Sequence, residues 1–553
     1  MQICQHNNTE IKAPNLLYPL ILLLVTFFYW VGTGNIHLFD WDEINFAEIS
    51  REMIVSGNFW QPTIDFLPFH EKPPLFSWFQ AFSFQLFGID EMAARLPNVL
   101  CGGFTLGSLY LVGRRWHSPA LGLWWTAFMA FSILPQLYFR SGIIDPWFNL
   151  FIFLSLATLL PAGTQGAPNP GRITVAGLLL GLAVLTKGPV AALLVGLTLG
   201  IWLLLRRPLF KTHWWRFLLV GLLSLLPIGL WIAYVWQLDD GFFAREFIRY
   251  QWRLFISEDA GHGGFPGYHV VVLLFGCFPA SIFALPELLN RKTSRAATSI
   301  LWPKILFWVV LILFSIVNTK IVHYSSLAYF PLTFLAARRA VDLLNEPRAL
   351  ISWAHRTGQI IWGLFALILI CLPLAFTYLL PELEIKDMDL QSSIAYGKPE
   401  LSGYWAIGLP LLILLYLLTN WQKRQQTLRY LIGQLSGATY LVVVVLLFYV
   451  GQVQRVTQGA NVDFFTDLAE RKEVYYGMAY RKSYVPLFYG KVRPANGGIA
   501  RDHRFHGAID RDLYFASPLR RTEQVLKEVP DAELLYSKGG FSFYRRPAIE
   551  PLE

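Results

Sequence analysis

Charged residues are scarce in this sequence. Only 15% of its 553 residues are charged, whereas an average soluble chain has about 25%. Hydrophobic residues make up 54% of the chain, and its mean hydropathy is +0.43. Such a composition excludes a disordered chain and a cytosolic enzyme built from several soluble domains. It predicts a protein that crosses a membrane many times.

Cysteine is also rare, with four residues in the whole chain. This excludes a small secreted fold held together by disulfides. Cys101, Cys277 and Cys371 fall in apolar stretches, where we expect them to act as small apolar side chains.

Long apolar stretches fill residues 1–452. A transmembrane helix needs about 20 predominantly apolar residues, and about thirteen stretches approach this requirement. They are 16–35, 95–113, 119–139, 147–161, 172–186, 189–205, 217–236, 269–289, 300–317, 324–340, 358–380, 404–420 and 430–451. We therefore predict a mainly α polytopic membrane protein with about 13 transmembrane helices.

The net charge of +9 is distributed by topology. Taken together, the alternate loops counted from the N-terminal tail contain far more Lys and Arg than acids, whereas the loops at 36–95, 237–268 and 381–403 are acidic. By the positive-inside rule the N-terminus is cytoplasmic and the acidic loops face outward. In a bacterial inner membrane that side is the periplasm. Since topology accounts for the basic excess, we expect the protein to contact membrane lipids and not nucleic acid.

Residues 453–553 are less apolar and differ in kind. Strand-like pieces alternate with turns and with one helical stretch near 522–529, which predicts a small soluble α/β domain on the periplasmic side. The predicted strands are 474–476, 513–515, 534–536 and 541–544.

The first outward loop, 36–95, contains conspicuous acids. Asp42 and Glu43 open a segment whose apolar residues recur at helical spacing through Met53, and this pattern predicts an amphipathic helix along the membrane surface. A second such helix is expected at 76–89. Acids at a helix start are also ordinary caps, so this pair alone does not establish a site.

Asp145, Lys187 and Lys320 lie between apolar stretches. Ionisable residues at the bilayer boundary usually face a polar cavity. The alternatives are a helix cap for Asp145, with Pro146 at the first helical position, and lysines that extend toward the membrane surface. Lysines on the acidic outward face favour a bound anion.

Together these residues suit a water-insoluble anionic substrate that reacts outside the membrane. Lysine binds phosphate as a point charge and would stabilise a phosphate leaving group. A carboxylate could accept the proton of an attacking hydroxyl.

These residues resemble the protein mannosyltransferase/aminoarabinose transferase family, which are membrane glycosyltransferases of GT-C type. The similar stretches follow one another in family order over roughly the first 340 residues, most closely to the bacterial aminoarabinose transferase branch. They are 42–57, Glu71-Lys72-Pro73-Pro74-Leu75, 86–88, 94–97, Arg140-x-Gly142-x-x-Asp145, 181–189 and Lys320-x-x-x-Tyr324.

The resemblance implies a GT-C fold and an inverting transfer of sugar from a polyprenyl-phosphate donor, of undecaprenyl type, to a lipid A-like lipid, glycan or protein acceptor. It implies Asp42 and Asp145 as catalytic carboxylates, with Glu43 adjacent. It also implies that donor phosphate is bound by Lys72, Lys320 and Tyr324, with Lys187 as a further candidate. No cofactor is required for the chemistry.

Two finer points follow from the resemblance. Glu71 and His262 match positions that hold a divalent metal in this branch, although two ligands fall short of a tetrahedral zinc site, so such a metal would be structural. Asn45 stands where the family often has arginine. Phosphate contacts from Arg245, Arg249 or Arg253 would compensate for that missing cation.

A transporter or flippase for an anionic polyprenyl-linked lipid is the alternative, because it would also need lysines at the membrane boundary. Transporters of this kind contain inverted repeats and broken helices, and no repeat is evident in the sequence.

Overall fold

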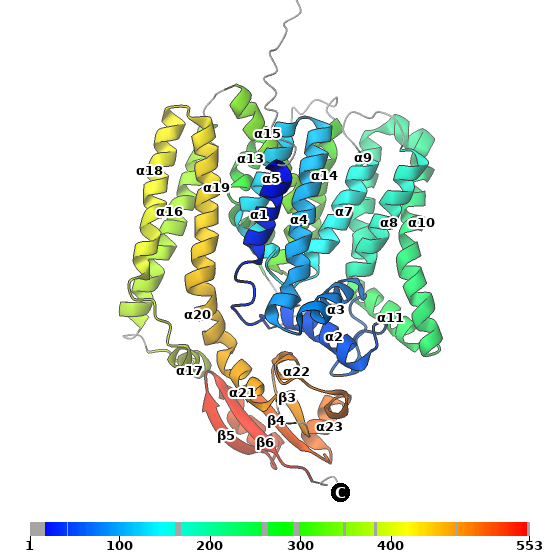
Figure 1. Ribbon diagram of the computed structural model, residues 1–553, viewed down its shortest axis with the longest axis vertical. Coiled ribbons are helices and arrows are strands. Elements are labelled where there is room, and N and C mark those ends of the chain that lie inside the picture. The colour runs from blue at the N-terminus through cyan, green and yellow to red at the C-terminus, as the bar shows by residue number, and fades with distance from the viewer. Residues whose placement is uncertain are drawn as a thin grey trace, which may run out of the picture.

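The computed structural model describes residues 17–40, 42–160, 168–256, 264–290, 298–346, 350–380, 384–469, 471 and 473–549. Its apolar helices stand side by side, and a small sheet region lies at one end of them (Figure 1). The connections that carry α2, α3 and α11 lie at this same end. We call it the sheet end of the bundle.

The helices of the bundle follow from the apolar stretches. They are α1 (Leu17–Trp30), α4 (Glu91–Trp116), α5 (Pro119–Phe131), α6 (Ile133–Tyr138), α7 (Asp145–Leu159), α8 (Pro170–Lys187), α9 (Val190–Leu205), α10 (Arg207–Leu238), α12 (Tyr268–Gly276), α13 (Ala280–Leu289), α14 (Thr298–Ile316), α15 (Tyr329–Asn345), α16 (Ser352–Leu374), α18 (Leu409–Lys423) and α19 (Thr427–Val444). A short 3-10 helix, η1 (Val322–Ala328), leads into α15.

Each of the thirteen predicted stretches overlaps a helix, so the mainly helical, polytopic fold is confirmed. Six helical runs in the described part of the chain are long and apolar enough to cross a membrane, and six shorter apolar helices accompany them. The number of spans stays a prediction. The stretch 119–139 is divided at Ser132, where extended backbone separates α5 from α6.

The loop after α1 contains the two predicted helices, α2 (Asp42–Ser56) and α3 (Leu75–Phe87). Between them lies a hairpin of β1 (Thr63–Ile64) and β2 (Leu67–Pro68). The prediction that α2 is amphipathic, with one polar face exposed to solvent, is wrong, because every residue from Glu43 to Met53 is buried. Its charged side chains Glu43, Glu48, Arg51 and Glu52 are paired inside the protein instead.

The C-terminal region is a four-stranded sheet with the order β3-β4-β6-β5, in which only β3 and β4 are parallel. The predicted strands and helix are confirmed. The elements are β3 (Val474–Met478), α22 (Val485–Phe488), α23 (Arg501–His506), β4 (Asp512–Pro518), α24 (Thr522–Glu528), β5 (Glu533–Lys538) and β6 (Phe541–Arg546).

The helical run Thr427–Leu468, which ends in α21 (Ala460–Leu468), leads from the bundle into this sheet and passes through the predicted boundary at 452–453, which stays a prediction. Gln458 on this run holds the start of the first loop. Its Nε2 donates to the Leu38 carbonyl at 2.7 Å, and its Oε1 accepts from the Asp40 amide at 3.0 Å. Tyr489 accepts from the Leu38 amide at 2.8 Å. The C-terminal region therefore fixes the chain two residues before Asp42.

Candidate active site

Asp145 begins α7 at the sheet end of the bundle, with Pro146 at the first helical turn. Its side chain is only 4% exposed, and Oδ1 accepts from Lys187 Nζ at 2.6 Å. Lys187 is the last residue of α8, so two helix ends meet in this ion pair. A buried carboxylate needs such a partner, because desolvation of an unpaired charge costs several kcal/mol.

Asp42 lies across from this pair at the start of α2, and its side chain is 39% exposed. His323 of η1 stands between the two carboxylates. Its Nε2 is 3.4 Å from Asp42 Oδ2 and 3.8 Å from Asp145 Oδ2. The Nε2 atom of His323 therefore faces both carboxylates, which come from the starts of two helices.

Lys72 and Tyr324 complete the cluster. Burial, followed by the charge of Lys187, lowers the pKa of Lys72, while Glu71, Asp42 and Asp145 oppose that shift. The ammonium of Lys187 lies 5.0 Å from the centre of the Tyr324 ring. The structure therefore brings Asp42, Asp145, Lys72, Lys187 and Tyr324 together around His323.

The helices that carry this cluster are tied to each other. Asn149, one turn into α7, donates to the Tyr138 hydroxyl at 2.6 Å and to Ser326 Oγ at 2.8 Å. Ser326 in turn donates to the carbonyl of His323 at 2.5 Å. This chain of hydrogen bonds fixes η1, and with it His323, against α7.

Glu43 lies beside the cluster but is turned into the protein. Its carboxylate binds the Arg95 guanidinium through two hydrogen bonds of 3.0 and 2.7 Å, and accepts from the amides of Phe39 at 3.0 Å and Gly142 at 2.6 Å. Burial alone would raise the pKa of Glu43, but Arg95 and these amides hold it below its usual value. Because Gly142 lies three residues before Asp145, Glu43 fixes the loop that presents this residue. Its predicted catalytic role stays a prediction.

Lys320 was predicted to bind donor phosphate, but in the structure its ammonium binds backbone carbonyls at the end of α14. Its side chain is buried, and Nζ donates to the carbonyls of Phe314, Ser315 and Val317 at 3.0, 2.8 and 2.5 Å. These are orphan carbonyls at the C-terminal end of α14, which a cation stabilises. Its predicted contact with donor phosphate stays a prediction that would require these bonds to open.

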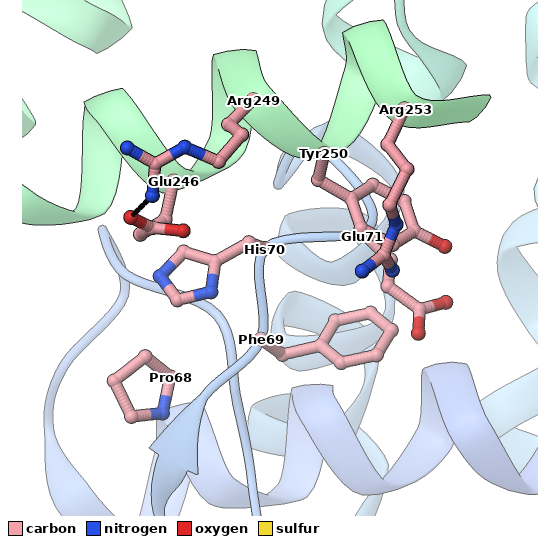
Figure 2. A pocket seen from close by; sticks show the side chains of 8 residues that line it. All are labelled: Pro68, Phe69, His70, Glu71, Glu246, Arg249, Tyr250 and Arg253. Carbon is pink, nitrogen blue, oxygen red and sulfur yellow. Dashed lines mark hydrogen bonds and ion pairs between the residues drawn. The ribbon is translucent and has the colours of Figure 1, made fainter. Parts of the chain in front are cut away.

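Glu71 borders a cavity of about 330 Å³ between the segment 68–71 and α11 (Phe242–Ile256). Figure 2 shows the side chains that line it, with Arg249 turned toward Glu246. The lining residues are Pro68, Phe69, His70, Glu71, Glu246, Arg249, Tyr250 and Arg253. Arg249 and Arg253 thus stand where they could contact an anion.

The predicted metal pair is not assembled in the described part of the chain. His262 lies outside the described residues, and the Glu71 carboxylate has Lys482 Nζ at 3.8 Å. No group of three or more His, Cys, Asp or Glu side chains among the described residues could hold a metal ion. The predicted pairing of Glu71 with His262 therefore stays a prediction, and no chemical step is assigned to a metal.

His323 is the residue that sequence reasoning missed. It stands in the motif that contains Lys320 and Tyr324, and a histidine in a short turn between apolar stretches was the available signal. Asn45, at the position where arginine is common, is buried, and its Oδ1 has no hydrogen-bond partner among the described residues.

Comparison with known proteins agrees with this arrangement. The family described as dolichyl-phosphate-mannose-protein mannosyltransferase matches residues 71–231. The crystal structure of ArnT from Cupriavidus metallidurans in the apo state superimposes with a TM-score of 0.72 at 19% identity, over 97% of this chain and 99% of that one. Over residues 71–231 the chain is similar to the protein mannosyltransferase/aminoarabinose transferase family, and over nearly its whole length it shares the fold of ArnT.

Proteins of similar sequence come from several bacteria. An undecaprenyl phosphate-alpha-4-amino-4-deoxy-L-arabinose arabinosyl transferase of Enterobacter sp. (strain 638) is 28% identical over 60% of this chain and 61% of its own length. The match therefore spans less than two thirds of that relative. The protein of the same description from Aeromonas salmonicida is 28% identical over 70% of this chain and 71% of its own length.

A second ArnT structure from Cupriavidus metallidurans, bound to undecaprenyl phosphate, superimposes with a TM-score of 0.71 at 19% identity. It covers 97% of this chain and 99% of that one. At this identity the likeness establishes the fold alone. The shared fold covers both the helical bundle and the C-terminal sheet region.

Proposed function

We propose that this protein is an inverting glycosyltransferase that transfers a sugar from an undecaprenyl-phosphate donor to a lipid A-like acceptor. The observation that carries the proposal is the meeting of Asp42 and Asp145 across His323, at 3.4 and 3.8 Å, beside Lys187. The relatives named undecaprenyl phosphate-alpha-4-amino-4-deoxy-L-arabinose arabinosyl transferases support 4-amino-4-deoxy-L-arabinose as the sugar.

In this proposal Asp42 is the carboxylate that meets the acceptor. It is the more exposed of the two acids, whereas the charge of Asp145 is compensated by Lys187 at 2.6 Å. The acceptor oxygen attacks the anomeric carbon from the side opposite the phosphate, and the bond from that carbon to the phosphate oxygen breaks. If the acceptor is a hydroxyl, its proton passes to Asp42. A phosphate acceptor is already an anion and needs no base.

The leaving phosphate carries away the electron pair, so it requires cations nearby. Lys72 and Lys187 are the candidates that the geometry favours, and Tyr324 lies within reach of Lys187. His323 serves as a positioning residue, because its Nε2 faces both carboxylates.

The proposed placement is a bacterial inner membrane, with the N-terminus cytoplasmic and the site and residues 453–553 periplasmic. About thirteen spans and a boundary at 452–453 belong to the same proposal. The acidic and basic loops described above support this orientation.

Mass spectrometry of lipid A and surface glycans tests the function in a strain that lacks this chain. We expect one sugar to disappear, and to return with the wild-type gene but not with Asp42→Asn or Asp145→Asn. Unchanged glycans in the deletion strain would contradict the proposal. Acceptor-independent movement of labelled undecaprenyl phosphate across vesicles containing the purified protein would favour the flippase.

A further inference from the structure

The hairpin between α2 and α3 ends in a turn with unusual backbone geometry. Asp65 and Phe66 have φ values of 59° and 56°. This left-handed region is unfavourable for residues that carry a Cβ atom, and tight two-residue turns of this kind normally use Asn and Gly. Such a conformation persists only when the surroundings hold it.

Glu52 of α2 holds the turn from inside the first loop. Its carboxyl oxygens accept from the amides of Asp65 at 2.5 Å and Phe66 at 3.0 Å, and from the Thr63 hydroxyl at 2.6 Å. Glu52 is completely buried. Both strained residues therefore have their amides bound by one side chain of α2.

The C-terminal region holds the turn from the other side. Arg504 of α23 pairs with Asp65 at 2.5 Å, and its NH1 donates to the Tyr476 carbonyl of β3 at 3.0 Å. The Gly498 amide donates to the Asp65 carbonyl at 2.7 Å. A Cβ atom on Gly497 would lie only 2.4 Å from the Phe66 ring, so the two regions are in close contact here.

The turn is also linked directly to the candidate site. The chain leaves the hairpin with Phe69, whose amide donates to the Pro62 carbonyl at 2.8 Å, and reaches Lys72 three residues later. In the other direction, Glu52 lies on the same helix as Asp42. Any displacement of the turn would therefore move the segment that carries Lys72 relative to α2.

We propose that Arg504 is a positioning residue through which the C-terminal region sets the place of Lys72 against Asp42. The proposal rests on the proposed function, because it assigns these two residues to the reaction. Arg504 touches no reacting group. It acts through Asp65, and the strained turn transmits the contact to the segment 69–72. Misplacement of a reacting group by about 1 Å can cost on the order of a hundredfold in rate.

The test compares Arg504→Gln with Arg545→Gln in the full-length protein in detergent. Arg545 is a matched control, because it pairs with Asp512 at 2.7 Å within the same sheet region. We expect Arg504→Gln to lower kcat about tenfold or more with KM for the donor within about threefold, and Arg545→Gln to change neither. Asp65→Asn should lower kcat similarly, and the double variant should lose no more than either single one.

Two further readouts do not depend on sugar transfer. In Arg504→Gln, amides 63–67 should exchange hydrogen faster, and Lys72 should react faster with an amine-modifying reagent. Arg504→Lys should restore both in part. If the wild type transfers no sugar, the proposed function fails. Hydrogen exchange and Lys72 labelling would still show whether Arg504 controls the position of the segment 69–72. Unchanged exchange and labelling, or faster exchange with unchanged kcat in an active enzyme, would overturn the positioning role.

Discussion

Asp42 and Glu43 are neighbours at the start of α2, yet their surroundings are opposite. The Asp42 side chain is 39% exposed, with His323 as its near partner. The Glu43 side chain is 7% exposed and bound by Arg95 and two backbone amides. A carboxylate that accepts a proton must be reachable by the substrate, whereas a fully paired one can only hold structure. The same contrast separates Lys187, which faces the cluster, from Lys320, which caps α14.

The largest effect should come from Asp42→Asn, which removes the proposed proton acceptor while keeping the size of the side chain. We expect kcat to fall by about 10²–10⁴, while the midpoint of thermal unfolding in detergent stays the same because the site is partly exposed. Turnover of a labelled undecaprenyl-phosphate sugar measures kcat, and differential scanning fluorimetry measures the unfolding midpoint.

Asp90→Asn is the matched control for this experiment. Asp90 caps α4 in the same loop through the Ala93 amide at 2.7 Å, and asparagine caps a helix equally well. Full turnover by Asp42→Asn would remove its catalytic assignment.

Glu43→Gln should give the reverse pattern. It leaves Arg95 without its buried carboxylate, and breaking such a pair typically costs about 3–5 kcal/mol. We expect a clearly lower unfolding midpoint and a smaller folded fraction, with most of the turnover retained per folded molecule. Glu91→Gln, in the half-buried pair with His37 at 2.8 Å, is the control. An unchanged midpoint together with lost turnover would instead make Glu43 a catalytic residue.

The two lysines extend the comparison. Lys187→Gln removes a cation of the cluster, and losing a hydrogen bond to a charged group costs about 1.5–3 kcal/mol, so kcat/KM for the donor should fall roughly 10–100-fold. The variant also leaves Asp145 buried without its partner, so its unfolding midpoint should fall as well. Lys320→Gln should leave donor kinetics nearly unchanged but lower the unfolding midpoint, because the carbonyls of α14 lose their donor. Steady-state kinetics at varied donor concentration measure kcat/KM for both variants. A large loss in Lys320→Gln with little loss in Lys187→Gln would instead support Lys320 as the residue that binds donor phosphate.

Most of the fold could be predicted because apolar stretches long enough to span a bilayer are a strong local signal. The prediction was wrong where tertiary contacts override that signal. The apolar spacing in α2 predicted one wet face, but Glu48 and Arg51 pair inside the protein through two hydrogen bonds of 2.7 Å, and the helix is buried on all sides. Hydropathy cannot report such pairing, because it treats each charged residue as exposed.

The candidate site was partly predictable for a similar reason. Ionisable residues beside apolar stretches identified Asp42, Asp145 and Lys187, and the structure brings them together. The different fates of Asp42 and Glu43 could not be predicted, since they depend on Arg95, which lies 52 residues later in the chain. The position of His323 between two helix starts likewise exists only in three dimensions.

The buried middle of α2 leads to a predicted effect on stability alone. Burial, followed by the neighbouring charge of Glu48, raises the pKa of Glu52 from 4.5 to about 9. The folded protein therefore keeps a proton that the unfolded chain releases above about pH 4.5. Since the folded state binds more protons, this group makes stability fall as pH rises, by up to about 1.4 kcal/mol per pH unit until about pH 9.

Glu52→Gln should abolish this dependence. The amide is neutral at every pH, but its nitrogen cannot accept a hydrogen bond, so one amide of the hairpin turn loses its partner at a constant cost of about 1 kcal/mol. Unfolding midpoints measured from pH 6 to pH 9 should start lower in the variant and approach or pass those of the wild type as pH rises. Glu523→Gln, on the exposed face of α24, should run parallel to the wild type. Parallel curves for Glu52→Gln as well would mean that Glu52 is ionised in the folded protein, and that the hairpin turn is held by a carboxylate rather than by a carboxylic acid.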